Sequence, residues 1–127
     1  MPHVRISLLT GKSNAYLQTL SDAVQDALVA SLDISPSDRF QVIEQLSAGQ
    51  FIVSNPLVGV EHAAETILIH ISLKAGRTVE MKKALYQALA TRLNSALGIS
   101  TNDVIIILND VAAENWSFGQ GLATLIA

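Results

Sequence analysis

Hydrophobic and polar residues follow a strand-helix-strand order along the first third of the chain. Residues 3–9 alternate apolar and polar side chains, as a half-buried strand does. In 14–32 the apolar residues recur three and four positions apart, which predicts an amphipathic helix with Ser13 as its N-cap. After turn-forming residues at 35–38, residues 40–46 predict a second strand. The first third is therefore predicted to form a βαβ unit.

The same pattern recurs 65 positions later. Residues 4–45 align with residues 69–110 without a gap, and the identical residues occupy strand faces, helix-core positions and turns. A duplicated unit keeps such positions. In the first copy the identical residues are Ile6, Ser7, Leu8, Gly11, Leu20, Ala23, Leu28, Leu32, Ile34, Ser35 and Asp38. We therefore expect one domain over 1–127, with repeat units at 3–46 and 67–111.

Two βαβ units side by side predict an α+β fold with a four-stranded mixed sheet and both helices on one face. In each unit a right-handed crossover joins two parallel strands. The segments 67–73 and 104–108 are apolar on both sides, so the face without helices also requires cover. We expect copies of the same chain to provide that cover, which makes self-association part of the predicted fold.

Two segments lie outside the repeat. Residues 47–66 contain glycines and short apolar pieces, and they predict a hairpin-like excursion with a turn at Asn55 and Pro56. Residues 112–127 begin with polar and aromatic residues and end in an apolar tail.

Composition narrows the classes of function. The chain has 127 residues, of which 50% are hydrophobic and only 15% charged, so we expect apolar surface to be buried between subunits. The net charge is −3 without a run of lysine or arginine, so no nucleic-acid partner is predicted. The chain lacks cysteine and its three histidines are far apart, so no metal site is predicted. With neither a membrane-spanning run nor a signal-peptide pattern, a cytoplasmic location is expected.

Several short motifs together resemble the tautomerase superfamily. They are Pro2 directly after Met1, the tandem repeat, the Gly-Arg-Thr step at 76–78, and the runs at 38–41 and 115–119. The longer-chain branch, which contains malonate semialdehyde decarboxylases and uncharacterised relatives, is the most similar. The resemblance implies a homotrimer without a cofactor, in which Pro2 lies at the floor of a pocket near a subunit boundary. It also implies a small enol or 2-oxo carboxylic acid as substrate.

The segment 74–77 departs from the decarboxylase group. That group carries two arginines one residue apart here, whereas this chain has Arg77 alone, preceded by an alanine and a glycine. Lys74 could offer a second cation, but an ammonium is a point charge rather than a planar fork. Tautomerisation is therefore the first prediction, and a decarboxylase or hydratase reaction is the alternative.

Pro2 itself has two interpretations. A proline can simply open an edge strand, where its missing N–H costs nothing. If Met1 is removed, Pro2 instead becomes a secondary amine that can act as a general base or acid. The repeat counterpart of Pro2 is Ile67, so the fold alone does not require proline there. If Met1 is retained, the nitrogen is an amide without basicity, and the chain would be a catalytically silent trimer.

Arg77 and Asp38 are the other catalytic candidates. Arg77 opens the second predicted helix, where free N–H groups favour an anion, so it could hold a substrate carboxylate bidentately. Its counterpart Lys12 allows the alternative of a solvated cation at a helix start. Asp38 could orient water or a substrate hydroxyl, as the resemblance implies. Its counterpart Asp103 occupies the same turn of the second repeat, so a turn or capping role explains both carboxylates equally well.

Four further residues are candidates for substrate binding. Lys74 is the possible second cation. Arg39 could be a second carboxylate contact or form a salt bridge with Asp38. Trp116 and Phe118 follow the last predicted strand and could either wall a pocket or seal a subunit contact, since large aromatics suit both uses.

Overall fold

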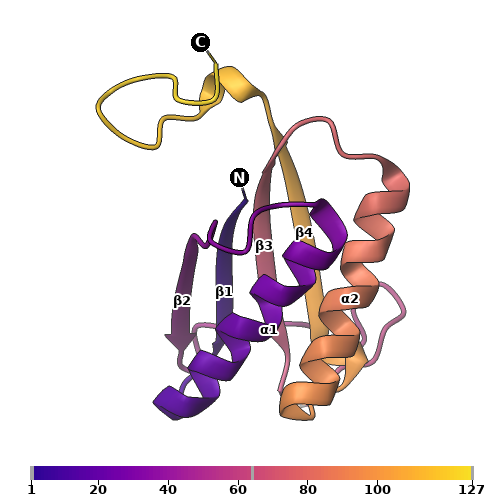
Figure 1. Cartoon of the computed structure of the whole chain (residues 1–127). Coiled ribbons are helices and arrows are strands. Elements are labelled where there is room, and N and C mark those ends of the chain that lie inside the picture. The colour runs from indigo at the N-terminus through magenta and orange to yellow at the C-terminus, as the bar shows by residue number, and fades with distance from the viewer. Residues whose placement is uncertain (1, 64, 127) are drawn as a thin grey trace.

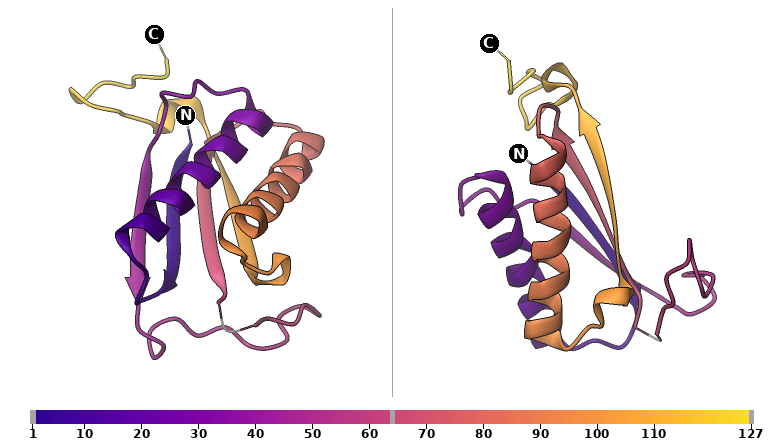
Figure 2. Two further views of the ribbon diagram at one scale, coloured as in Figure 1. Left: turned by 60° about the horizontal axis from the view of Figure 1, so that its bottom comes forward. Right: turned by 90° about the vertical axis from the view of Figure 1, so that its right-hand side faces the viewer.

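The computed structural model describes residues 2–63 and 65–126. It has two layers, a four-stranded sheet and a pair of helices that cover one face of it (Figures 1 and 2). The elements in chain order are β1 (His3–Leu9), α1 (Asn14–Leu32), β2 (Gln41–Leu46), β3 (Ile67–Lys74), α2 (Val79–Leu97), η1 (Thr101–Asp103), β4 (Val104–Val111) and η2 (Ala113–Asn115). The predicted α+β fold, with a mixed sheet and both helices on one face, is confirmed.

The duplication seen in the sequence is repeated in the local structure. Helices α1 and α2 have 19 residues each, and both their ends are 65 positions apart. Ser13 and Thr78 cap them in the same way, each accepting a hydrogen bond from a backbone N–H three residues later. Gly11 and Gly76 have backbone φ values of 107° and 125°, which residues with a Cβ rarely adopt. This conformation explains why both copies have glycine after their first strand.

The strand register decides what meets at each end of the sheet. The order is β2-β1-β3-β4, and the two pairs within repeats, β1 with β2 and β3 with β4, are parallel. The central pair β1 and β3 is antiparallel, with His3 opposite Ser72. One end of the sheet therefore combines the starts of β1 and β2 with the ends of β3 and β4. The N-terminus and the C-terminal segment lie at this end (Figure 1).

The core lies between the sheet and the two helices. Alternate residues of β1 and β3 face the helices, and Ile6 and Ile69 at the sheet centre are fully buried. The remaining buried apolar residues are Val4, Leu8, Leu20, Ala23, Val24, Ala27, Leu28, Leu32, Ile67, Ile71, Leu73, Leu85, Leu89, Leu93 and Ile99.

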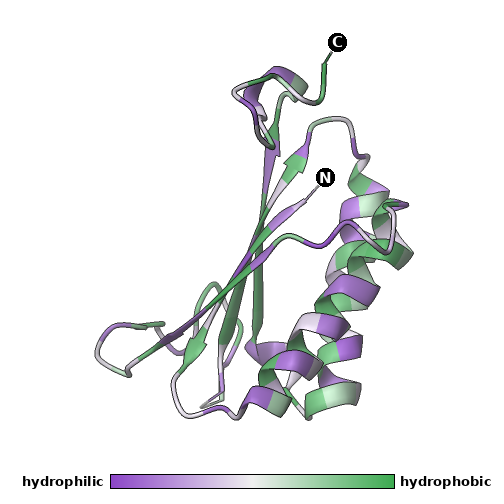
Figure 3. Ribbon diagram, turned by 60° about the vertical axis from the view of Figure 1, so that its left-hand side comes forward, coloured by the Kyte–Doolittle hydropathy of each residue, from purple (hydrophilic) through white to green (hydrophobic). Residues whose placement is uncertain are grey.

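The opposite face of the sheet carries exposed apolar side chains. Ile107 is 49% exposed, and its neighbours in sequence face the core, so it points away from the helices. Phe40 and Val42 on the other edge are 48% and 37% exposed. Strand β2 begins at Gln41, one residue later than predicted, although the Phe40 carbonyl already accepts a hydrogen bond from the Val4 amide at 3.0 Å. Figure 3 shows the helices gathered on one side of the sheet and the other side open.

The excursion over 47–66 leaves the sheet at the end opposite the termini (Figure 2). Its hairpin-like turn lies at Val58 and Gly59, closed by a bridge between Leu57 and Val60, so the predicted position at Asn55 and Pro56, where the backbone only bends, is wrong by three residues. Residue 64 of the excursion and residue 127 of the predicted tail lie outside the described residues. Among the described helices, none combines the length and apolar character needed to cross a membrane.

Asp103 anchors the excursion to the second repeat. This residue is only 1% exposed, and its carboxylate accepts hydrogen bonds from the Ala63 amide at 2.7 Å and the Thr66 hydroxyl at 3.3 Å. A second link is the ion pair of Lys12 with Glu65 at 2.6 Å, whose hydrogen bond raises the pKa of Lys12. The excursion is therefore tied to both repeats by side chains.

We predict that Asp103→Ala lowers the free energy of unfolding by about 1–3 kcal/mol, because it removes a buried acceptor and both of its part-buried hydrogen bonds. The matched control is Asp38→Ala at the equivalent position of the first repeat, which we expect to change stability by less than about 0.5 kcal/mol. Urea denaturation of both variants measures the difference. Equal losses at the two positions would contradict the anchoring role of Asp103.

Candidate functional site

A small cavity opens at the end of the sheet where β1 starts. It has a volume of about 220 Å³ and is lined by Pro2, Ser37, Asp38, Arg39, Phe40 and Phe118. Four of these residues are among the seven predicted from the sequence. They come from three separate segments, namely the start of β1, the loop before β2 and the C-terminal segment. Pro2 is buried in this arrangement.

The position of Pro2 follows from the sheet. Two residues after Pro2, the Val4 amide donates to the Phe40 carbonyl at 3.0 Å, which ties the start of β1 to the loop before β2. The rings of His3 and Phe40 lie 4.5 Å apart between their centroids and reinforce this link. Pro2 therefore lies beside the loop that carries Asp38.

Asp38 ends a compact turn at 35–38. Its amide donates to the Ser35 carbonyl at 3.0 Å, and the hydroxyls of Ser35 and Ser37 are 2.8 Å apart. Within the described part of the chain, the Asp38 carboxylate forms no hydrogen bond or ion pair. A half-buried carboxylate without an internal partner is available to a ligand, a water or a substrate hydroxyl.

Arg39 is held by the first helix. Its guanidinium Nη1 forms an ion pair with Asp22 at 2.7 Å and donates to the Ser21 hydroxyl at 3.0 Å. The hydrogen bond from Arg39 holds the pKa of Asp22 below its usual value. Of the two roles predicted for Arg39, a salt bridge with Asp38 is therefore wrong, because the guanidinium turns toward α1 instead.

Lys74, Arg77 and Trp116 lie at the same end of the sheet, beyond the described lining of the cavity. The guanidinium of Arg77 donates to the Lys74 carbonyl at 2.8 Å, while the Lys74 side chain is solvent-exposed. The indole of Trp116 donates to the Val111 carbonyl at 3.2 Å. Trp116 also stacks on Phe118, with ring centroids 5.5 Å apart and 15° between the planes, so it supports one wall of the cavity.

The two ends of the sheet differ in how their charges are satisfied. At the excursion end, Lys12 pairs with Glu65 and the Asp103 carboxylate accepts two hydrogen bonds. Their counterparts at the cavity end are Arg77 and Asp38, and neither forms an ion pair with a described residue. The cavity end therefore offers one guanidinium and one carboxylate to a ligand.

Sequence reasoning missed some residues that build the cavity. Ser37 and Phe40 belong to its lining, and Gln25 of α1 donates hydrogen bonds to the loop that carries Asp38. The sequence contains one signal for Gln25. Its repeat counterpart is Ala90, so the repeated helix does not itself require a polar side chain at this position. Periodicity alone does not distinguish such a buried amide from a residue at the edge of the apolar stripe.

Comparison with known proteins agrees with this geometry. Two family models, both described as tautomerase enzymes, match residues 38–119 and 2–60. The chain is 40% identical over 126 residues to the probable tautomerase YusQ of Bacillus subtilis (strain 168), with 99% of each chain covered.

Solved structures show the same architecture over nearly the whole chain. One match is malonate semialdehyde decarboxylase, solved in wild-type, proline-to-alanine mutant and inactivated forms. Its TM-score is 0.89 at 28% identity, and the match covers 97% of this chain and 95% of the decarboxylase chain. A wild-type fused 4-OT in a symmetric trimer matches with a TM-score of 0.78 and 28% identity, covering 94% and 93%. The matches to family models, to a close relative and to these structures lead to one conclusion: the chain belongs to the tautomerase family of enzymes.

Proposed function

We propose that this protein is a cofactor-independent tautomerase in which Pro2, made N-terminal by removal of Met1, moves a proton on small enol and 2-oxo carboxylic acids. Met1 lies outside the described residues, so its removal is part of the proposal. The observation that carries the proposal is the cavity in which buried Pro2 lies beside the Asp38 carboxylate, which no described residue binds by a hydrogen bond or an ion pair. The name of the YusQ relative supports a tautomerase, and the proline-to-alanine mutant of the decarboxylase supports a role for the proline.

The cavity suits a small acid. Its volume of about 220 Å³ lies below the range of roughly 300–1,000 Å³ that is typical of sites for drug-sized ligands. Arg77 is the group we assign to the substrate carboxylate, since a guanidinium binds a carboxylate bidentately and α2 begins two residues later. Lys74 adds a second positive charge nearby, and Phe118 with Trp116 provides an apolar wall.

The proposed reaction needs only proton transfer. Burial favours the neutral form of an amine, so Pro2 can act as a base near neutral pH. The Asp38 carboxylate orients the enol hydroxyl. The Pro2 nitrogen accepts the proton of this hydroxyl and then delivers it to the carbon of the double bond. One O–H bond breaks, one C–H bond forms, and the carbonyl is restored without oxidation or reduction.

A decarboxylase or hydratase reaction is the second candidate. The observation that favours it is the Asp38 carboxylate, which is free of described partners in the same cavity as Pro2. In this reaction a protonated Pro2 would stabilise developing negative charge while Asp38 activates a water. The decarboxylase with a TM-score of 0.89 supports this candidate, whereas the single arginine at 74–77 supports the tautomerase.

We also propose that the active form is a homotrimer. The face of the sheet without helices carries exposed Phe40, Val42 and Ile107, and such a two-sided apolar sheet requires cover. The fused 4-OT of the same fold forms a symmetric trimer, which supports three copies as the cover. Phe40 belongs both to this face and to the cavity lining, so the assembly would border the site.

Replacing the proposed catalytic amine tests the tautomerase. We expect Pro2→Ala to slow the conversion of a phenylpyruvate-type enol to its keto form by at least about 100-fold, because acid–base catalysis contributes about 10²–10⁴-fold. Ultraviolet absorbance of the enol follows the reaction, and light scattering checks that the assembly is unchanged. The matched control is the wild-type chain isolated with Met1 attached, which we expect to be inactive.

Intact mass, measured on the same samples, separates the enzyme from a silent assembly protein. A native chain lacking the mass of one methionine agrees with the proposal. A uniformly full-length native chain without turnover would instead make the protein a catalytically silent member. Full activity of the mature Pro2→Ala variant would remove Pro2 from the mechanism.

The second candidate has its own discriminating variant. If the protein decarboxylates malonate semialdehyde, Asp38→Asn should reduce that turnover by about 100-fold or more, because the carboxylate activates water in that reaction. Enol conversion should fall by only about 10-fold, because there the carboxylate only orients a hydroxyl. Headspace carbon dioxide and aldehyde consumption measure the decarboxylation. An absence of turnover of malonate semialdehyde by the mature wild-type chain would exclude this candidate.

A charge on the open face tests the trimer. We expect Ile107→Lys to convert the trimer to monomers in light scattering coupled to gel filtration, because a lysine cannot be buried there without a partner. The control is Val79→Lys, which alters a residue that is 61% exposed on the helical layer and should keep the trimer. A trimer that persists in Ile107→Lys would place the interface elsewhere.

A further inference from the structure

Gln25 is a polar residue inside the helix face that packs on the sheet. It is 3% exposed and shares α1 with the buried apolar residues Leu20, Val24 and Leu28. Burying an amide among apolar groups is unfavourable unless its donors find acceptors. The hydrogen-bond partners of Gln25 therefore indicate why this position is not simply apolar.

Both donors of the Gln25 amide serve one loop. Nε2 donates to the carbonyl of Asp38 at 3.0 Å and to the carbonyl of Pro36 at 3.4 Å. These carbonyls lie on either side of Ser37, within the turn that lines the cavity. The buried amide thus fixes the backbone of the turn against the rigid helix α1.

A second set of contacts holds the residue that follows Asp38. The Arg39 guanidinium binds Asp22 at 2.7 Å and the Ser21 hydroxyl at 3.0 Å. The Gln41 amide donates to the Ser21 carbonyl at 3.1 Å. Asp38 is therefore clamped from both sides by α1, while its own carboxylate stays without a described partner.

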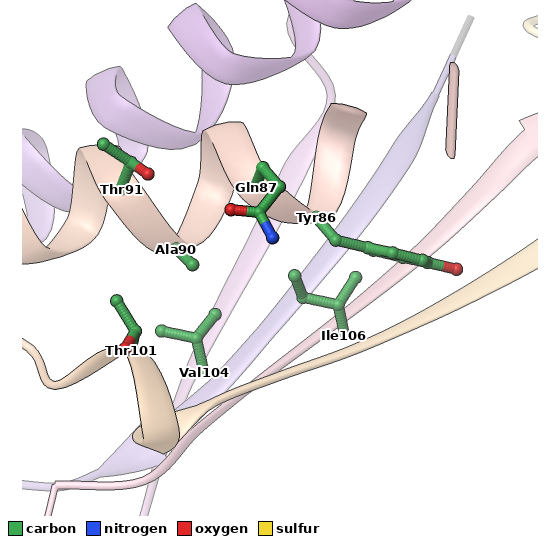
Figure 4. A pocket seen from close by; sticks show the side chains of 7 residues that line it. All are labelled: Tyr86, Gln87, Ala90, Thr91, Thr101, Val104 and Ile106. Carbon is green, nitrogen blue, oxygen red and sulfur yellow. The ribbon is translucent and has the colours of Figure 1, made fainter. Parts of the chain in front are cut away.

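The second repeat shows that the fold does not need these contacts. The counterparts of Gln25, Arg39 and Gln41 are Ala90, Val104 and Ile106, and none of them can donate through a side chain. The equivalent space between α2 and β4 is an open groove of about 450 Å³ (Figure 4). The second repeat nevertheless forms the same strand-helix-strand unit with a helix of equal length, so the polar contacts of the first repeat serve something other than the βαβ unit.

We propose that Gln25 is a positioning residue that holds Asp38 at the cavity. This inference rests on the proposed function of the cavity, since Asp38 must act on the substrate for its position to matter. Gln25 binds the Asp38 carbonyl, and the carbonyl fixes the backbone from which the carboxylate reaches Pro2 and the substrate. Without the amide, the turn can move away from α1 and the carboxylate loses its place.

Gln25→Leu is the test variant, because leucine keeps most of the volume and removes both donors. We expect kcat/KM for enol conversion by the mature enzyme to fall about 5- to 10-fold, mainly through kcat, because a displaced carboxylate no longer orients the hydroxyl. The loss should not exceed that of Asp38→Asn. The matched control is Ala90→Leu, which adds the same side chain at the equivalent position facing the open groove. We expect that control to retain wild-type activity.

A double-mutant cycle separates positioning from general destabilisation. In the Asp38→Asn background, Gln25→Leu should lower kcat by less than about twofold, because the two changes remove one function. Equal losses of activity in both backgrounds would overturn the proposal, because a purely structural effect ignores the identity of residue 38. Melting temperatures of all variants provide the comparison for stability.

Hydrogen exchange tests the positioning without relying on turnover. The amides of residues 35 and 37–39 should exchange at least about tenfold faster in Gln25→Leu than in wild type, and those of the equivalent residues 100 and 102–104 should not change. Unchanged exchange at 35–39 would overturn the proposal. If the wild type converts no enol but this exchange still accelerates, the proposed function fails while the positioning of the loop by Gln25 stands.

Discussion

The antiparallel pairing of β1 with β3 is the constraint on which the arrangement of the site depends. Each repeat is parallel within itself, so only this central pair reverses direction. The reversal places the start of β1 beside the end of β3, with His3 opposite Ser72. Pro2 therefore lies near the turn after β3 that carries Arg77. Had the two units joined in parallel, these groups would lie at opposite ends of β1 and β3, about 25 Å apart for strands of this length.

The same pairing creates two equivalent sheet ends that the chain uses differently. At one end the excursion supplies Glu65 to Lys12 and backbone donors to Asp103. The ion pair is partly exposed, with side chains 21% and 56% accessible, so it contributes little to stability. Its main consequence is neutralisation, because a satisfied charge no longer attracts a small acid. At the cavity end Arg39 and Lys82 pair with Asp22 and Asp110. Arg77 and Asp38 form no ion pair with a described residue, which makes the two ends chemically unequal within one symmetrical framework.

The sequence predicted those features that depend on local patterns or on the repeat. Both helices begin and end where periodicity and capping residues indicated, and the gathering of Pro2, Asp38 and Phe118 follows once the strand order is known. The pairing of Arg39 with Asp22 could not be predicted in this way. It joins residues 17 positions apart, and its geometry depends on how α1 packs against β2. Periodicity likewise does not predict which carbonyl groups accept hydrogen bonds from the side-chain amide of Gln25.

Phe40 connects the chemistry to the assembly. Its ring lies against His3, lines the cavity and remains 48% exposed on the face that lacks helices. A cover on that face would remove this ring from water and close the cavity on one side. The resulting desolvation would favour a neutral amine at Pro2 and strengthen the attraction between Arg77 and a carboxylate. In the proposed mechanism the isolated chain therefore supplies the reacting groups, whereas a second copy would supply the environment that makes them effective.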